Sequence, residues 1–185
     1  MTSDIQDAIS KLGEGCCIHV SLSNEDYAQL AGKPLTSHLL SKRRPLAYIN
    51  VSRPSAKQQE ALDEEAKKSV FFVDFASGSE SVFSREERNI LYLHSPEALS
   101  ELGISLFSKD LFGGKKKIIV LDNLSELLKK NDERTVKCLL EFLRSRIEIS
   151  GDCGLVISVE NKGDDTAKKL ASSFCKHTVR IMGKR

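Results

Sequence analysis

The chain has 185 residues and a formal net charge of +2, and 40% of its residues are hydrophobic and 29% charged. These values are typical of a soluble globular protein, so we expect a single domain over residues 1–185. No apolar run approaches the roughly 20 residues that a membrane-spanning helix needs, and the acidic N-terminal segment is unlike a signal peptide. The small net charge gives no general electrostatic reason to expect nucleic acid or a membrane as the partner.

Five cysteines are present, an odd number without a repeated spacing. This pattern does not describe a secreted disulfide framework, and it favours the reducing cytoplasm as the location. Cys16, Cys17 and His19 are residue types that bind zinc, but alternation along a strand places Cys16 on the opposite face from the other two. No C-x-x-C partner exists elsewhere, so we assign no metal ligand.

Short apolar runs bounded by turn residues predict the strands. In chain order these are residues 16–22, 46–52, 70–75, 89–95, 117–122, 154–160 and 178–182. The long polar stretch of residues 76–88 is predicted to be a surface loop, and a regulatory role is one hypothesis for it.

Amphipathic or capped segments between these runs predict the helices. They are residues 4–12, 23–44 with a break near Gly32 and Pro34, 55–68, a helix that opens at Ser95-Pro96 and ends before Gly113, 124–128, 131–150 and 164–174. Strands that alternate with helices in this way predict an α/β protein, a three-layer α/β/α sandwich with a mainly parallel sheet.

Residues 115–130, KKKIIVLDNLSELLKK, contain a run of four apolar residues that ends on Asp122. Such a run is typical of a buried parallel strand that carries an acid to the carboxyl edge of the sheet, where ligands bind. In nucleotide-hydrolysing proteins an acid at this place helps to hold Mg²⁺. The alternative is a structural residue that caps the helix starting at Leu124.

Three segments carry a resemblance to a known family: residues 89–106, NILYLHSPEALSELGISL, residues 115–147 and residues 154–182. Their order and content resemble the KaiC-like branch of the RecA-type P-loop ATPases, in its archaeal form. The resemblance implies a RecA-like sheet in which the last strand lies beside the first, followed by the strands near residues 154, 117 and 46. It also implies that Asp122 is the Walker B acid, that Glu160 or Asn161 faces the same site, and that ATP with Mg²⁺ is the ligand.

The sequence departs from this family directly after the first strand. A phosphate-binding loop needs G-x-x-x-x-G-K-[ST], whose backbone N–H groups converge on the phosphates. Here the chain reads Leu22-Ser23-Asn24-Glu25-Asp26-Tyr27, with no glycine and two acids. Each acid would repel a triphosphate charge by about 4 kcal/mol at about 4 Å. Asn123 stands where many related ATPases have a catalytic acid, so we assign no catalytic residue and expect a degenerate domain.

The segment Gly32-Lys33-Pro34-Leu35-Thr36, ten residues beyond the strand, contains the GK pair of the motif. One interpretation is a simple helix break, because Pro34 has neither an N–H nor a hydroxyl to offer. The other is an altered nucleotide site formed by Lys33, Thr36 and Asp122, with Arg53 as a further cation.

Three functional hypotheses follow. The first is a catalytically inactive KaiC/RecA-like domain that acts as a regulatory or signalling protein-interaction module, with a second copy or an active paralogue as its partner. The second is an ATP-binding or weakly hydrolysing protein that uses the altered site. The third is an accessory DNA-binding protein that uses Lys115–Lys117 and Lys129-Lys130, which the 6% aromatic content and the absence of Trp disfavour.

Overall fold

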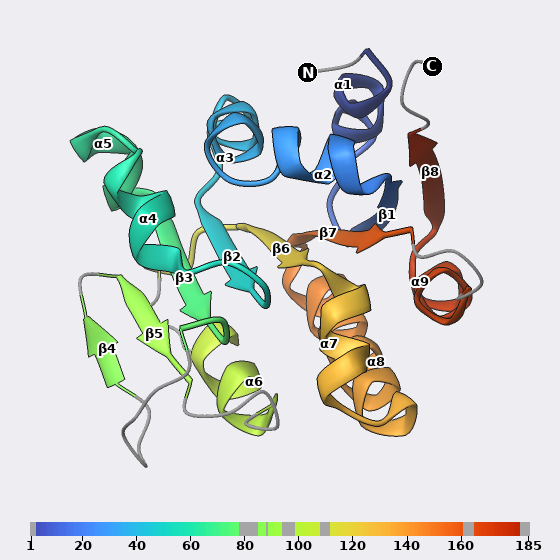
Figure 1. Cartoon of the computed structure of the whole chain (residues 1–185). Helices are drawn as coiled ribbons and strands as arrows, with labels where there is room; N and C mark the ends of the chain where they lie inside the picture. The colour runs from blue at the N-terminus through green and yellow to red at the C-terminus, as the bar shows by residue number, and fades with distance from the viewer. Residues whose placement is uncertain are drawn as a thin grey trace.

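The computed structural model describes residues 3–77, 85–87, 89–93, 99–107, 112–160 and 165–181. A central sheet crosses the molecule and helices cover both of its faces (Figure 1). Its strands are β1 Cys16–Leu22, β2 Leu46–Asn50, β3 Val70–Asp74, β4 Arg85–Glu87, β5 Ile90–Tyr92, β6 Ile118–Asp122, β7 Cys153–Val159 and β8 His177–Ile181.

The strand order is β4-β5-β3-β2-β6-β7-β1-β8. All neighbours are parallel except β4 and β5, which pair antiparallel. The mainly parallel sheet is therefore confirmed, and so is the predicted order that runs from the last strand through β1, β7 and β6 to β2.

The helices divide into two layers, one on each face of the sheet (Figure 1). One layer holds α1 Ser3–Ser10, α2 Asn24–Leu30, α3 Lys33–Leu40, α4 Ser55–Glu60 and α5 Glu64–Lys68. The other holds α6 Leu99–Phe107, α7 Leu124–Lys130, α8 Glu133–Ser150 and α9 Thr166–Phe174. This arrangement confirms the three-layer α/β/α sandwich.

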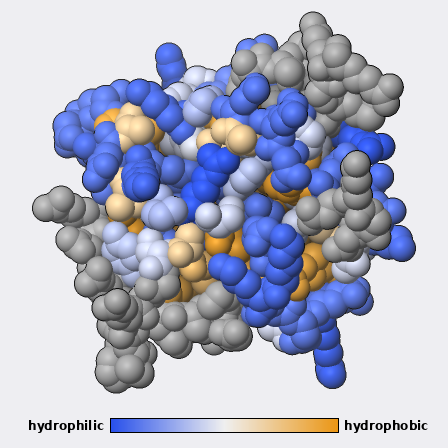
Figure 2. All heavy atoms as spheres, in the orientation of Figure 1, coloured by the Kyte–Doolittle hydropathy of each residue, from blue (hydrophilic) through white to orange (hydrophobic). Residues whose placement is uncertain are grey.

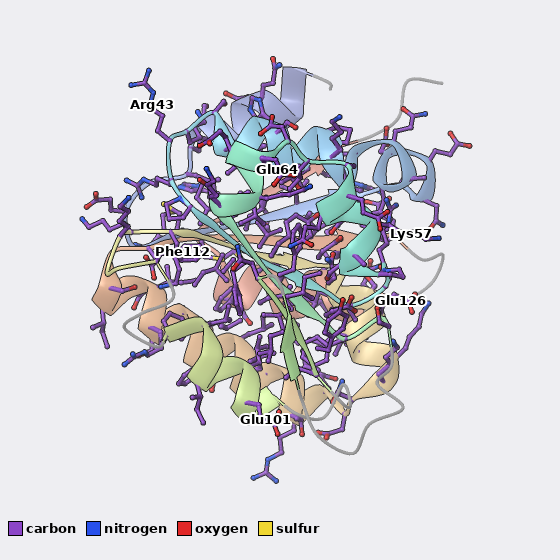
Figure 3. All side chains as sticks on the ribbon, turned by 90° about the vertical axis from the view of Figure 1, so that its left-hand side faces the viewer. Arg43, Lys57, Glu64, Glu101, Phe112 and Glu126 are labelled. Carbon is purple, nitrogen blue, oxygen red and sulfur yellow. The ribbon has the colours of Figure 1, made fainter. Side chains whose placement is uncertain are left out.

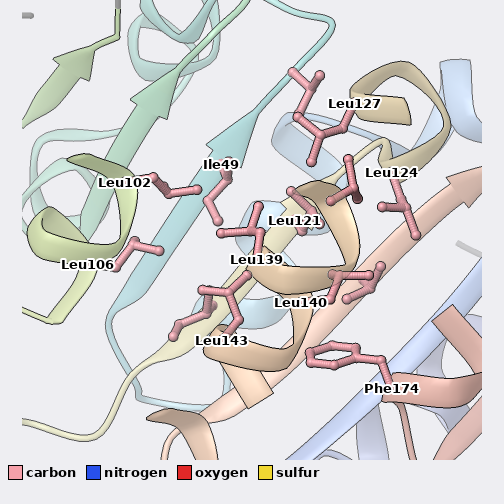
Figure 4. Packing of buried hydrophobic residues seen from close by; sticks show 14 of the residues in the cluster. Ile49, Leu102, Leu106, Leu121, Leu124, Leu127, Leu139, Leu140, Leu143 and Phe174 are labelled. Carbon is pink, nitrogen blue, oxygen red and sulfur yellow. The ribbon is translucent and has the colours of Figure 1, made fainter. Parts of the chain in front are cut away.

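Alternation along each strand sends neighbouring side chains into two separate cores. Ile49 and Leu121 face the layer of α6 to α9, whereas Tyr48 and Val120 face the other layer. Figure 4 shows the first core, in which leucines of α6, α7 and α8 surround Ile49 and Leu121. Each fully buried leucine of this kind stabilises the fold by about 1.5–3 kcal/mol, so the apolar face of α8 holds it on the sheet.

Two predicted elements differ from the structure. The helix predicted over residues 55–68 is two helices, because Asp63 accepts a hydrogen bond of 2.8 Å from the N–H of Ala66 and starts α5 afresh. The loop predicted over residues 76–88 contains β4, which forms a hairpin with β5. Asn89 lies in the turn with a φ of 65°, a conformation that asparagine tolerates better than most residues.

Several predicted features lie outside the described residues. They are most of the 76–88 loop, namely residues 78–84 and 88, and the predicted start of α6 at Ser95-Pro96. Hydrophilic side chains cover most of the face seen in Figure 2, and hydrophobic residues show through only in small patches. None of the helices that the structure describes combines the length and the apolar character that a membrane crossing requires.

Candidate functional site

Three polar residues lie side by side where adjacent parallel strands end. Asn50 of β2 is in register with Asp122 of β6 on one side and with Asp74 of β3 on the other. All three are buried, with relative exposures of 0%, 0% and 1% respectively. Because open α/β sheets bind ligands at this edge, the row defines the candidate site.

Asp74 has a structural role in this row. Its carboxylate accepts hydrogen bonds from the N–H groups of Ser55, Ala76 and Ser77, at 2.6, 2.8 and 2.8 Å, and from the Ser77 hydroxyl at 2.8 Å. Asn50 donates to the Ser55 hydroxyl and to Gln58 Oε1, both at 2.7 Å. These bonds hold the connection from β2 to α4, so Asp122 is the acid of the row that is left for chemistry.

The connection from β1 to α2 is a single residue. The Ser23 hydroxyl accepts a hydrogen bond of 3.1 Å from the N–H of Asp26 and donates one of 2.6 Å to its carboxylate. Ser23 is thus the N-cap, and α2 begins at the next residue, Asn24. The first turn carries Glu25 and Asp26. No extended loop remains at this place whose N–H groups could surround a phosphate.

Tyr27 of α2 lies close to Asp122 and to the residues that follow β2. Its hydroxyl shares a hydrogen bond of 2.7 Å with the Ser52 hydroxyl, and its side chain is buried. The Arg53 guanidinium stacks 4.6 Å from the centre of the Tyr27 ring. Arg53 also donates to the carbonyl oxygens of Ala31 at 2.9 Å and Tyr27 at 3.2 Å. Through these two hydrogen bonds and the ring contact, Arg53 links α2 to the loop that follows β2.

Asp122 lies close to Tyr27 and Arg53. Oδ2 accepts a hydrogen bond of 3.2 Å from the Tyr48 hydroxyl, while Oδ1 has no partner among the described residues. Burial raises the pKa of Asp122 from 3.8 to about 6, although the Tyr27 hydroxyl, the Arg53 guanidinium and the Tyr48 hydroxyl each lower it. The carboxylate is consequently costly to ionise and is close to its titration midpoint near pH 6.

The predicted structural role of Asp122 as a helix cap is wrong. The N-cap of α7 is Asn123, whose Oδ1 accepts a hydrogen bond of 3.1 Å from the N–H of Glu126. Asn123 adopts the left-handed conformation with a φ of 75°. Asp122 is still part of the strand, so its side chain stays on the face covered by α2 and α3, and the cap passes to the next residue.

A cavity of about 220 Å³ lies beside Tyr27. It is lined by Asn24, Tyr27, Ser52, Arg53, Asn123, Ser125, Glu126, Lys129 and Val159. Ligand pockets are commonly about 300–1,000 Å³, so this one is small for a nucleotide. The resemblance implied Glu160 or Asn161 at the site: Glu160 does not line the cavity and instead pairs with Arg180 at 2.6 Å, and Asn161 lies outside the described residues.

Neither Lys33 nor Thr36 lines this cavity. Lys33 is exposed in the first turn of α3, and Thr36 is buried one turn later with no hydrogen-bond partner for its hydroxyl among the described residues. Gly32, immediately before them, has a φ of 99°, and a Cβ placed there would lie 3.5 Å from Gln58 Nε2 and 3.9 Å from Arg53 Nη1. The structure thus brings the start of α3 to the edge of the site without aiming Lys33 into the cavity.

These residues do not fit Mg·ATP as the P-loop families hold it. Asp122 is enclosed by two phenols, and α2 presents acids where phosphates would lie. Sequence reasoning missed both phenols. Tyr27 occupies an apolar position of a helix and Tyr48 an apolar position of a strand, so each was indistinguishable from an ordinary core residue. The available signal was the hydroxyl, because a buried tyrosine needs a hydrogen-bond partner.

In sequence, the chain matches no protein-family model and no curated protein. In structure, it is similar to a KaiC-like protein from the hyperthermophilic archaeon Pyrococcus horikoshii, with a TM-score of 0.61 and 11% identity over 93% of this chain and 74% of that chain. It is also similar to the flagellar accessory protein FlaH from Methanocaldococcus jannaschii, with a TM-score of 0.57 and 15% identity over 98% of this chain and 79% of that chain.

A third similar structure is an uncharacterised protein from Pyrococcus horikoshii in complex with an unknown peptide. Its TM-score is 0.61, with 11% identity over 98% of this chain and 83% of that chain. The chain therefore has the fold of the KaiC-like, RecA-type ATPase domains, as the sequence resemblance implied. At these identities the likeness concerns the fold, and the function has to be argued from the site.

Proposed function

We propose that this protein is a catalytically inactive KaiC/RecA-like domain of archaeal type that acts in the cytoplasm as a regulatory or signalling protein-interaction module. The observation that carries the proposal is the position of Tyr27. Its hydroxyl, bonded to Ser52 at 2.7 Å, lies over Asp122 at the edge where a P-loop protein holds phosphates. A phenol at this place excludes the ligand that hydrolysis requires.

Electrostatics supports the same conclusion. Glu25 and Asp26 lie in the first turn of α2, where their charges oppose a bound triphosphate. Asn123, which follows Asp122, has its side-chain oxygen bonded to the N–H of Glu126. An amide has no basic lone pair comparable to that of a carboxylate, so it cannot take a proton from an attacking water.

The proposed partner is a second copy of the chain or an active KaiC/RecA-like paralogue, and the proposed contact surface is the carboxyl edge of the sheet. The resemblance supports this choice, because relatives of this type assemble into rings with the nucleotide at the subunit boundary. Lys129 and Glu126 beside the small cavity form an ion pair of 2.5 Å with each other, and this polar pair would lie at the contact surface.

Isothermal titration with Mg·ATP tests the inactive site. We expect no micromolar Mg·ATP binding that depends on Asp122, so the titrations of the wild-type protein and of Asp122→Ala should give the same result. Glu133→Ala, which removes an acid from the first turn of α8, is the matched control. Micromolar binding that disappears in Asp122→Ala and persists in Glu133→Ala would show that the site is a nucleotide site.

Light scattering over a concentration series tests the interaction. We expect either a mass above that of the monomer or, in a mixture with an active KaiC-like ATPase from the same organism, a complex with a changed ATPase rate. A monomer at every concentration that leaves such an ATPase unbound and unaffected would contradict the proposed module.

The second candidate function is nucleotide binding in an altered geometry. Two buried oxygens favour it, since the Thr36 hydroxyl and Asp122 Oδ1 both have no hydrogen-bond partner among the described residues. A bound nucleotide with its metal could satisfy both. A crystal soaked with a nonhydrolysable ATP analogue separates the two candidates, and density between Ser23 and Asp122 would establish this one.

A further inference from the structure

A second cavity lies at the opposite end of the strands, where β2, β3 and β6 begin. It has a volume of about 660 Å³, which is within the range of small-molecule sites. Its lining includes four basic side chains, one acidic side chain and one aromatic ring, namely Arg43, Arg44, Lys68, Lys115, Glu65 and Phe112. None of these residues contributes to the site around Asp122.

The charges around this cavity are unevenly compensated. Lys68 pairs with Glu65 at 2.7 Å, and Arg44 pairs with Glu14 at 3.3 Å. In contrast, neither the Arg43 guanidinium nor the Lys115 ammonium forms an ion pair within the described part of the chain. Both residues contribute to the lining of the cavity, and two cations at one cavity that have no ion-pair partner among the described residues attract a multiply charged anion.

The backbone around Arg43 is also unusual. Arg43 adopts a φ of 57°, in the left-handed region, and Gly113 and Gly114 across the cavity have φ values of 58° and 73°. The Arg43 N–H donates a hydrogen bond of 2.9 Å to the Leu40 carbonyl oxygen, so the left-handed residue ends the turn that follows α3. The conformation costs a residue with a Cβ about 1–2 kcal/mol and suits glycine or asparagine.

The rest of the lining indicates the shape of the ligand. Leu40, Pro45 and Ala66 provide apolar surface, and the Phe112 ring is half-buried. A simple inorganic ion would occupy little of this volume. The combination of free cations with an apolar wall and an aromatic ring suits a compound that carries several phosphates.

We propose that this cavity, which we call the amino-edge cavity, binds the polyphosphate group of a small molecule through Arg43 and Lys115. The polyphosphate can belong to a nucleotide or be inorganic, since the two share the group that the cations recognise. Figure 3 shows Arg43 and Phe112 at one end of the molecule, whereas Lys57 and Glu126 lie at the other end, near the site around Asp122. The proposal is independent of the proposed function.

Isothermal titration of the full chain with inorganic tripolyphosphate, without magnesium and at low salt, tests the cavity. We expect binding that weakens as salt is added, because screening acts on exposed cations. In the double variant Arg43→Gly with Lys115→Ala the affinity should fall at least about tenfold, since two charge-assisted contacts are lost. Glycine is chosen at position 43 because it tolerates the left-handed φ and so keeps the fold.

The matched control removes two exposed lysines at the other end of the sheet, Lys33→Ala with Lys57→Ala, and it should bind tripolyphosphate as the wild type does. Titrations with ATP and with adenosine show whether the polyphosphate group belongs to a nucleotide. ATP that binds more tightly than tripolyphosphate, while adenosine alone does not bind, indicates a nucleotide. Equal affinity for ATP and tripolyphosphate indicates an inorganic polyphosphate.

Three outcomes would overturn the proposal: no binding at low salt, unchanged binding in the Arg43/Lys115 variant, or binding that is lost only in the Lys33/Lys57 control. The third outcome would place the polyphosphate site at the carboxyl edge of the sheet. Asp122→Ala separates this test from that of the proposed function, because it should leave tripolyphosphate binding unchanged.

Discussion

The Tyr48 hydroxyl donates a hydrogen bond of 3.2 Å to Oδ2 of Asp122, and both side chains are fully buried. The two residues lie on adjacent strands, with Asp122 at the end of β6 and Tyr48 two residues before the end of β2. A carboxyl group that would contact water in an open nucleotide site is therefore part of the core. This burial is the physical basis of the first prediction.

The stability of the protein should depend on the charge state of Asp122. Its pKa is raised from 3.8 to about 6 in the folded state, so the folded protein binds more protons than the unfolded chain between these values. The free energy of unfolding should consequently fall as pH rises through this window, by about 3 kcal/mol from this group. Asp122→Asn should remove the fall, and urea denaturation from pH 4 to pH 7 measures the difference from wild type. The exposed-acid variant Glu25→Gln should follow the wild-type curve, and an Asp122→Asn curve parallel to it would contradict the prediction.

The Tyr27 hydroxyl should stabilise the packing of α2 against Asp122 and the residues that follow β2. Tyr27→Phe removes the 2.7 Å bond to Ser52 and should lower the free energy of unfolding by about 1 kcal/mol. It should also raise the pKa of Asp122 further, because the Tyr27 hydroxyl lowers that pKa. Urea denaturation measures the first effect, and the pH dependence of the same experiment measures the second. Equal stability of Tyr27→Phe and wild type would argue against a closed site.

Asn123 should be more tolerant of glycine than of alanine. The residue caps α7 and holds a φ of 75°. Glycine at a cap costs a few tenths of a kcal/mol, whereas alanine loses about 1 kcal/mol of cap energy and adds about 1–2 kcal/mol of left-handed strain. Thermal or urea unfolding should therefore rank wild type above Asn123→Gly and that variant above Asn123→Ala. The reverse order of the two variants would contradict the left-handed assignment.

Gly154 should not tolerate a side chain, because β7 lies close to Cys17 and Ile147 at this position. A Cβ at this position would lie 2.8 Å from Cys17 Sγ and 2.9 Å from Ile147 Cδ1. Gly154→Ala should cost about 1–3 kcal/mol through overpacking. Ile147→Val removes one of the clashing atoms, so a double-mutant cycle should show a favourable coupling between the two changes. Gly13→Ala is the control, since no atom of the described residues, apart from its own chain neighbours, lies within 4 Å of its Cβ position. Simple additivity in the cycle would mean that Ile147 is not the obstacle.

The secondary structure of the central strands could be predicted because its signals are local. The run CCIHVSL between Gly15 and Ser23 predicted β1 with the bounds that the structure shows, Cys16–Leu22. A break in the helix near Gly32 and Pro34 was also predicted, and it separates α2 from α3. β4 was missed because three residues in a polar stretch carry no periodicity, and only pairing with β5 makes them a strand.

The candidate site divides in the same way. That Asp122 ends a buried strand and that no glycine-rich loop follows β1 could be predicted from the sequence, because both depend on neighbouring residues. The surroundings of the carboxylate could not, because they come from elements far apart in the chain. Tyr48 is 74 residues away from Asp122 along the chain, and Tyr27 is on a different element again, so their convergence depends on how β2, β6 and α2 pack. The role of Asn123 as the cap was likewise decided by a left-handed backbone angle at the strand end, which residue types alone do not specify.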